Sequence, residues 1–131
     1  MSVHIQPDNS KGYLCIVVVD SLPTVEELES NMKDFLQSGR YAKDIDVLFD
    51  LTGVDFSAAR SDLFREYITV REHHPERRNA KIALLVSSEV AFGLLRMYQI
   101  LSEKQKQQIM VFHNREEAER WLQEGNRPFH L

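Results

Sequence analysis

The polar residues best placed for chemistry lie at or directly after the ends of two apolar segments that are typical of buried strands, residues 45–51 and 80–86. In open α/β sheets, ligands bind beyond the carboxyl ends of the strands. The candidates for a ligand-binding or partner-binding loop are therefore Asp50, Thr52, Asp55, Ser57, Ser87 and Ser88. The competing interpretation is that these side chains satisfy backbone groups in loops and helix caps.

Two other residue types could take part in catalysis or metal binding. The one cysteine, Cys15, lies in an apolar run, so we expect a buried small hydrophobic residue; as a catalytic thiol it would lack a base close in sequence. His73 and His74 are adjacent, whereas metal ligands on a helix need a spacing of three or four residues. We expect a polar helix end and no metal, and a weak surface metal contact with Glu72 or Glu76 is the alternative.

Composition and motifs disfavour several classes of function. The net charge is −4 and the pI is about 5.7, which argues against a general binder of nucleic acid or anionic membranes. The five glycines are not spaced as a dinucleotide-binding or P-loop fingerprint requires, so we expect no cofactor and no enzymatic activity. There is one local cluster of basic residues, Arg71, Arg77, Arg78 and Lys81. We expect it to be a solvated surface with salt bridges, and contact with an anion or an acidic partner is the alternative.

The chain of 131 residues fits one domain, residues 1–131. Its single cysteine cannot form a disulfide within the chain. The first residues lack the basic and apolar regions of a signal peptide. The apolar runs are far shorter than the roughly 20 residues of a membrane-spanning helix. We therefore expect a cytoplasmic protein without integral membrane association.

The apolar pattern predicts a β-β-α-β-α-β-α-β-α order. Strands alternating with helices favour a mainly parallel sheet with right-handed crossovers, and the first strand is expected to form an antiparallel edge. Capping boxes at Thr24 and Asn114 mark two helix starts, and Gly39 and Gly125 mark the corresponding ends. The expected strands are 3–6, 13–19, 45–51, 80–86 and 108–112. A turn at 7–12 joins the first two strands, and a tail covers 126–131. The two middle helices are expected at 58–73 and 90–105.

The expected helix at 90–105 is apolar on more than one face. One stripe consists of Ala91, Leu94, Leu95, Tyr98 and Leu101, and Phe92, Met97 and Ile100 lie largely off it. A second apolar face can mean deeper burial, a surface for self-association, or the wall of an apolar pocket. The sequence leaves these three interpretations open.

Several segments together resemble the STAS domain, and more closely the SpoIIAA-like, STAS/SEC14-type branch of small bacterial proteins. The resemblance covers nearly all of residues 3–124, and its motifs are patterns rather than catalytic signatures. It depends on the initial hairpin, on Ser21-Leu-Pro-Thr24, on Val47-Leu-Phe-Asp-Leu-Thr-Gly-Val-Asp-Phe56, on the strand 80–86 with the helix after it, on Ile109-Met-Val-Phe112, and on Glu116-Glu-Ala-Glu-Arg-Trp-Leu122.

The resemblance implies a fold and a non-enzymatic function, either protein interaction or binding of a small or lipid-like ligand. Anti-sigma-factor antagonists of this type carry a phosphorylatable serine in the loop after the matching strand. In register with that loop, the phosphoacceptor position falls on Arg60 and the aspartate position on Ala58. Ser57 and Ser61 flank Arg60, and a shift of one residue would bring Ser61 into register.

Three functional hypotheses follow from the sequence. The first is a non-catalytic STAS-like regulatory or protein-interaction domain that forms a homodimer through the helix at 90–105. The second is a carrier or sensor of a small apolar ligand. The same residues are candidates for its apolar pocket and for the interface of the first hypothesis: Phe64, Tyr67, Phe92, Leu95 and Met97. The third is an enzyme using Asp50, Ser57 and a histidine, and the spacing of these residues gives it no support.

Overall fold

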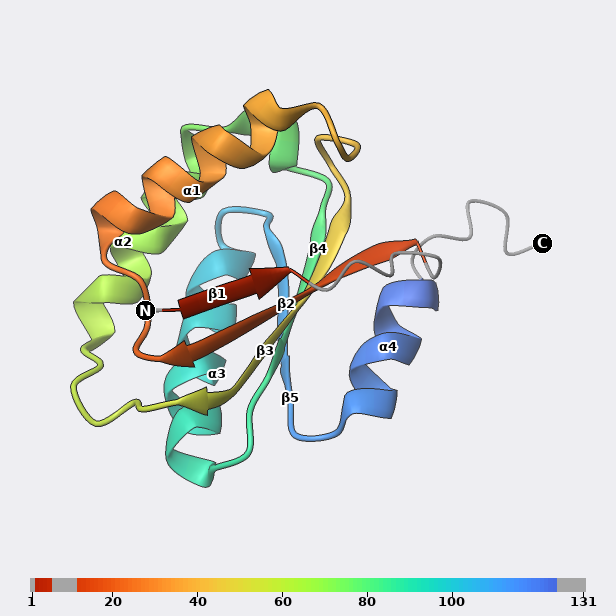
Figure 1. The fold of residues 1–131 in the computed structure, drawn as a ribbon. Coiled ribbons are helices and arrows are strands. Elements are labelled where there is room, and N and C mark those ends of the chain that lie inside the picture. Colours follow the sequence, from red (N-terminus) through yellow and green to blue (C-terminus); the bar gives the residue numbers. More distant parts are fainter. Residues whose placement is uncertain (1, 6–11, 125–131) are drawn as a thin grey trace.

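The computed structural model describes residues 2–5 and 12–124 and contains four α-helices and a five-stranded sheet (Figure 1). The predicted tail, Gly125 and the predicted turn apart from Gly12 lie outside the described residues. The strands are β1 (Ser2–Ile5), β2 (Tyr13–Asp20), β3 (Asp46–Val54), β4 (Lys81–Leu85) and β5 (Gln108–Phe112). The helices are α1 (Val25–Ser38), α2 (Ser61–Glu72), α3 (Glu89–Glu103) and α4 (Arg115–Glu124), with a short 3-10 turn at Pro75–Arg77.

The order of the strands across the sheet is the same as their order along the chain. β2, β3, β4 and β5 pair in parallel, and β1 pairs antiparallel with β2. The predicted α/β class with a parallel sheet and four helices is therefore confirmed.

The helices form two layers on opposite faces of the sheet. Right-handed crossovers between successive neighbouring strands place every connecting helix on the same face. Accordingly α1 contacts α2 and α2 contacts α3, whereas α4 contacts β3, β4 and β5 from the other face (Figure 1). Alternate residues of β2 serve the two layers: Leu14 and Ile16 pack with α1–α3, while Tyr13 and Cys15 pack with α4.

The side chains of helix α1 are less buried than its sequence suggests. Its start and end are as predicted, because Thr24 and Glu27 form the capping box and Gly39 adopts a left-handed conformation with φ of 68°. The helical spacing of the apolar residues in this segment predicts one buried stripe, and that prediction is wrong in degree, since no residue of α1 is fully buried. The stripe is only half-buried, and its members are Val25, Leu28, Met32, Phe35 and Leu36. The physical reason is that α1 lies at the end of the helix row, with a neighbouring helix on one flank only.

The strand β3 extends to Val54 and is longer than the expected strand 45–51, so residues 52–54 belong to the strand and not to the loop after it. Its last residues pair with the end of β2, after an irregularity in register between Val17 and Val19. Gly53 suits this close pairing, because a Cβ there would lie 3.1 Å from Cγ1 of Val19. Asp50 and Thr52 consequently lie within the strand rather than beyond it.

The predicted solvated basic surface is wrong for Arg71 and Arg77, which are both buried. Nη1 of Arg77 donates to the carbonyl oxygens of Lys43 (3.0 Å) and Ile45 (2.6 Å), and its guanidinium lies over the ring of Phe35. Nη2 of Arg71 donates to the carbonyl oxygen of Arg77 at 3.1 Å. These side chains tie the segments at the amino ends of the strands together, and sequence spacing alone could not reveal that.

No helix in the described part of the chain is long and apolar enough to cross a membrane.

The contacts of Arg77 predict a large loss of stability when its side chain is replaced. Arg77→Met leaves two carbonyl oxygens without their donor, so the free energy of unfolding should fall by about 2–4 kcal/mol in urea denaturation. Arg77→Lys should restore little of it, because lysine lacks the planar fork of donors. The matched control is Arg78→Met at the exposed neighbouring position, which should change stability by less than about 0.5 kcal/mol. Equal losses in the two methionine variants would contradict this role.

Burial raises the pKa of Tyr98 from 10.0 to about 12. Above about pH 10 the phenol of Tyr98 ionises in the unfolded chain but stays protonated in the folded chain. The free energy of unfolding therefore falls as the pH rises from about 10 to about 12. The lowered pKa of Arg77, about 10 because of burial and the nearby charge of Arg71, acts in the opposite sense. The comparison of wild type with Tyr98→Phe isolates the tyrosine: between pH 9 and about 11.5, unfolding free energies should fall less in the variant. An identical pH dependence would show that Tyr98 is not the cause.

Candidate functional site

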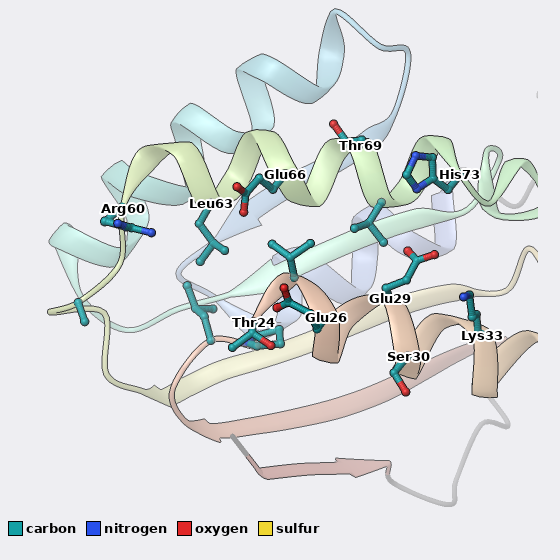
Figure 2. Close-up of a pocket in the computed structure, with 15 residues that line it drawn as sticks. Thr24, Glu26, Glu29, Ser30, Lys33, Arg60, Leu63, Glu66, Thr69 and His73 are labelled. Carbon is teal, nitrogen blue, oxygen red and sulfur yellow. The ribbon is translucent and has the colours of Figure 1, made fainter.

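An open groove of about 1010 Å³ lies between α1 and α2 and is here called the α1–α2 groove (Figure 2). Its apolar surface comes from Leu22, Pro23, Val25, Leu63 and Val70, together with Ala58. Its polar surface comes from Thr24, Glu26, Glu29, Ser30, Lys33, Arg60, Glu66, Thr69 and His73. The groove therefore combines an apolar lining with charged groups of both signs.

The two helices that form the groove are tied together at two points. The hydroxyl of Tyr67 on α2 donates to the carbonyl oxygen of Pro23, just before α1, at 2.5 Å. Nε2 of His74, just after α2, lies 3.1 Å from Oε1 of Glu29. Between these points Glu26 and Glu29 point toward α2, while Leu63 points toward α1 (Figure 2). The walls are thus fixed in relation to each other, as a preformed binding site requires.

Glu29 has an unsatisfied acceptor. Its Oε2 atom is buried and makes no hydrogen bond within the part of the chain that the structure describes. A buried acceptor without a donor is costly, by about 1–3 kcal/mol. Because that atom is closed to solvent, a ligand in the open groove would instead meet the exposed carboxylates of Glu26 and Glu66. The groove is therefore suited to a ligand with an apolar part and a donor.

Of the residues proposed for the ligand-binding or partner-binding loop, one borders the groove. Arg60 lies at the amino end of α2, lines the groove, and is 3.6 Å from Oδ1 of Asp62. It precedes Ser61, the first residue of α2. Asp55 and Ser57 lie in the loop before it, where the backbone N–H of Ser57 donates to Oδ1 of Asp55 at 2.9 Å. That hydrogen bond lowers the pKa of the Asp55 carboxyl.

The remaining loop candidates have local structural contacts. Oδ1 of Asp50 accepts hydrogen bonds from the backbone N–H (3.0 Å) and the hydroxyl (2.6 Å) of Thr52. Ser88 caps α3 by accepting from the backbone N–H of Ala91 at 3.1 Å, and Ser87 is exposed beside it. Asp50 is turned toward α4 and Arg60 lines the groove of the opposite layer, so the loop candidates are divided between two faces.

A second polar cluster lies under the amino end of α4. Nη1 of Arg115 is 3.6 Å from Oδ2 of Asp50, and Nη2 of Arg115 is 3.1 Å from the sulfur of Cys15. Nearby, the hydroxyl of Tyr13 donates to the carboxylate of Glu119. Cys15 is buried in the smaller core, so Arg115 both covers the thiol and pairs with Asp50.

The residues proposed for an apolar pocket or interface occupy different environments. Phe64, Tyr67 and Leu95 are buried in the larger core, where the ring of Phe64 lies 6.0 Å from that of Tyr67. Phe92 is half-buried and stacks on His113 with ring centroids 4.3 Å apart. Met97 is exposed on α3. None of these residues lines the α1–α2 groove.

Most of the groove was not predicted from the sequence. Glu26, Glu29 and Lys33 recur at three- or four-residue spacing on α1, and Leu63 and Glu66 do so on α2. That spacing places each set along one side of its helix. The sequence does not show that the two helices are neighbours, so it could not reveal that these two sets of residues face each other.

Comparisons of the chain with protein-family models, with curated proteins and with solved structures found no match. Within residues 2–5 and 12–124, no group of three or more His, Cys, Asp or Glu side chains could hold a metal ion.

The burial of Cys15 predicts an unreactive thiol. Its side chain is only 4% exposed and Arg115 lies against the sulfur. A thiol reagent such as DTNB can therefore react only after local unfolding exposes the thiol. We expect labelling of the native protein to be at least about a hundredfold slower than labelling in guanidinium chloride. Arg115→Ala should accelerate native labelling, while Arg120→Ala, at an exposed position on the same helix, should not. Equally fast labelling in the native and unfolded states would show an accessible thiol.

Proposed function

We propose that this protein is a non-catalytic regulatory domain of the STAS-like type, and that it binds a partner protein in the α1–α2 groove. The observation that carries the proposal is the groove itself, which is large, partly apolar, and walled by two helices tied together through Tyr67 and Glu29.

The resemblance to STAS domains supports this choice of surface. In that family the loop before the second helix is where partners are bound, and the corresponding position here is Arg60. Arg60 borders the α1–α2 groove, so this position of the expected partner loop lies beside the groove. The parallel sheet of β2–β5 with four helices is compatible with the α/β architecture that the resemblance implies.

The shape and charge of the groove favour an amphipathic helix as its occupant. Helices that bind in grooves place apolar side chains on the apolar lining and polar ones at the rim. Here Leu63 and Val70 supply apolar contacts, and Glu26, Glu29 and Glu66 supply carboxylates. A lysine or arginine of the partner would pair with the exposed carboxylates of Glu26 and Glu66. We therefore infer a partner segment with an apolar face flanked by basic residues.

The second candidate function is that of a carrier for a small apolar ligand. It is favoured by the volume of the groove, about 1010 Å³, which is at the upper end of the roughly 300–1,000 Å³ of small-molecule sites. The charged rim and the openness to solvent favour the protein partner instead, because a carried apolar molecule is usually enclosed on most sides.

A photo-crosslinking amino acid placed in the groove tests the proposal. At position 26 it should give one discrete protein adduct in cells, and at Asn31, an exposed position of α1 outside the groove lining, it should not. The partner identified in this way, once purified, should bind the wild type directly. Leu63→Asp and Glu66→Lys should each weaken its Kd at least about tenfold, by disrupting the apolar and the charged contact respectively.

Three outcomes would argue against the proposal. Adducts that are equal at positions 26 and 31, or binding that is unchanged in both groove variants, would move the partner site elsewhere. Saturable binding of the apolar dye anilinonaphthalene sulfonate at one site, lost in Leu63→Asp, together with no adduct at position 26, would support the carrier function instead. Circular dichroism of each variant would verify that it is folded.

A further inference from the structure

The outer face of α3 carries an exposed apolar stripe. Val90 is 69% exposed, and Met97 and Ile100 are each 47% exposed. Among the described residues they are three of the four large hydrophobic side chains that are exposed. Their spacing places them on one side of the helix, opposite Ala91, Leu95 and Tyr98, which face the core. We call Val90, Gly93, Met97 and Ile100 the α3 stripe.

Gly93 lies at the centre of the α3 stripe. A Cβ atom built at this position would have no atom within 4 Å, so the packing of the chain itself does not require glycine there. Glycine inside a helix is unfavourable relative to alanine. Its useful property is that another backbone or a large side chain can approach the helix closely at that point. The stripe thus has a flat centre between apolar side chains.

A hollow borders the same stripe. It has a volume of about 200 Å³ and is lined by Arg65 of α2 and by Met97, Ile100 and Leu101 of α3. A partner surface that covers the stripe could place one apolar side chain in this hollow. The stripe and the hollow together form a surface that is flat at its centre and has a depression at its edge.

We propose that the α3 stripe is the contact surface between two copies of this chain, with their α3 helices antiparallel across a two-fold axis. A two-fold contact is made by the same surface on both copies. In an antiparallel pair centred near Gly93 and Met97, the large side chains of one stripe lie over the glycine of the other. The arrangement accounts for the glycine, for the exposed apolar residues and for the hollow.

The charges at the ends of α3 select the antiparallel orientation. Glu89 lies in the first turn, and Lys104 is the residue that ends the helix. Antiparallel pairing brings Glu89 of each copy toward Lys104 of the other, and it also aligns the helix dipoles favourably. Parallel pairing would bring like charges together at both ends. A second copy is therefore an occupant whose charge pattern fits the stripe.

This inference is independent of the proposed function of the α1–α2 groove. The stripe belongs to α3, the groove is formed by α1 and α2, and no residue lines both the groove and the stripe. A dimer through α3 leaves both grooves unobstructed by the contact helices. Failure of the dimer and failure of partner binding can therefore be told apart with separate variants.

Sedimentation velocity of the full chain over a range of concentrations tests the inference. The wild type should be a dimer that dissociates on dilution. Gly93→Leu should weaken the dimer at least about a hundredfold, because the new side chain occupies the contact point, yet the monomer should stay folded since that space is open. Ile100→Glu should have the same effect through a buried charge. Leu63→Asp in the groove is the control and should leave the dimer intact.

A charge exchange tests the orientation. Glu89→Lys and Lys104→Glu should each weaken the dimer, and the double variant should recover much of the loss, since opposite charges again face each other. A wild type that stays monomeric up to about 100 μM would overturn the inference, given that specific dimers typically have Kd values well below this. Dimers that persist in both Gly93→Leu and Ile100→Glu would equally overturn it, and an additive loss in the double variant would exclude the antiparallel contact.

Discussion

The strands lie in the sheet in the order in which they occur in the chain, and the placement of every helix follows from this order. With right-handed crossovers, this order forces α1, α2 and α3 onto one face, side by side and pointing the same way. Only the helix after the last strand, α4, is free to cover the other face. The division of β2 into Leu14 and Ile16 for one layer and Tyr13 and Cys15 for the other follows from the same constraint.

A row of three helices has unequal positions, and both proposed binding surfaces arise from this inequality. The middle helix, α2, is packed from both flanks, and its Phe64 is among the most buried large side chains of the protein. The terminal helix α1 has no fully buried residue, so it leaves a groove beside α2. The other terminal helix, α3, is buried on one side and carries apolar residues on the other, which leaves the α3 stripe uncovered.

The sequence predicted the elements well because local signals determine them. The capping box at Thr24, the left-handed Gly39 and the apolar run of β5 each depend on neighbouring residues only. What sequence patterns could not predict depends on distant partners. Arg77 is buried because carbonyl oxygens of Lys43 and Ile45 lie within its reach, and Glu29 belongs to a groove only because α2 lies opposite. The loop candidates Asp50 and Arg60 fall on opposite faces for the same reason.

We infer that the row formed by α1, α2 and α3 offers its surfaces to proteins and does not hold a small molecule. Native mass spectrometry of the purified chain, followed by the same sample after denaturation, distinguishes these two roles. At micromolar concentration the native mass should be that of a dimer, equal to twice the mass of the denatured chain, with nothing else bound. A monomer carrying extra mass that disappears on denaturation would contradict it, and would identify the α1–α2 groove as the site of a carried ligand.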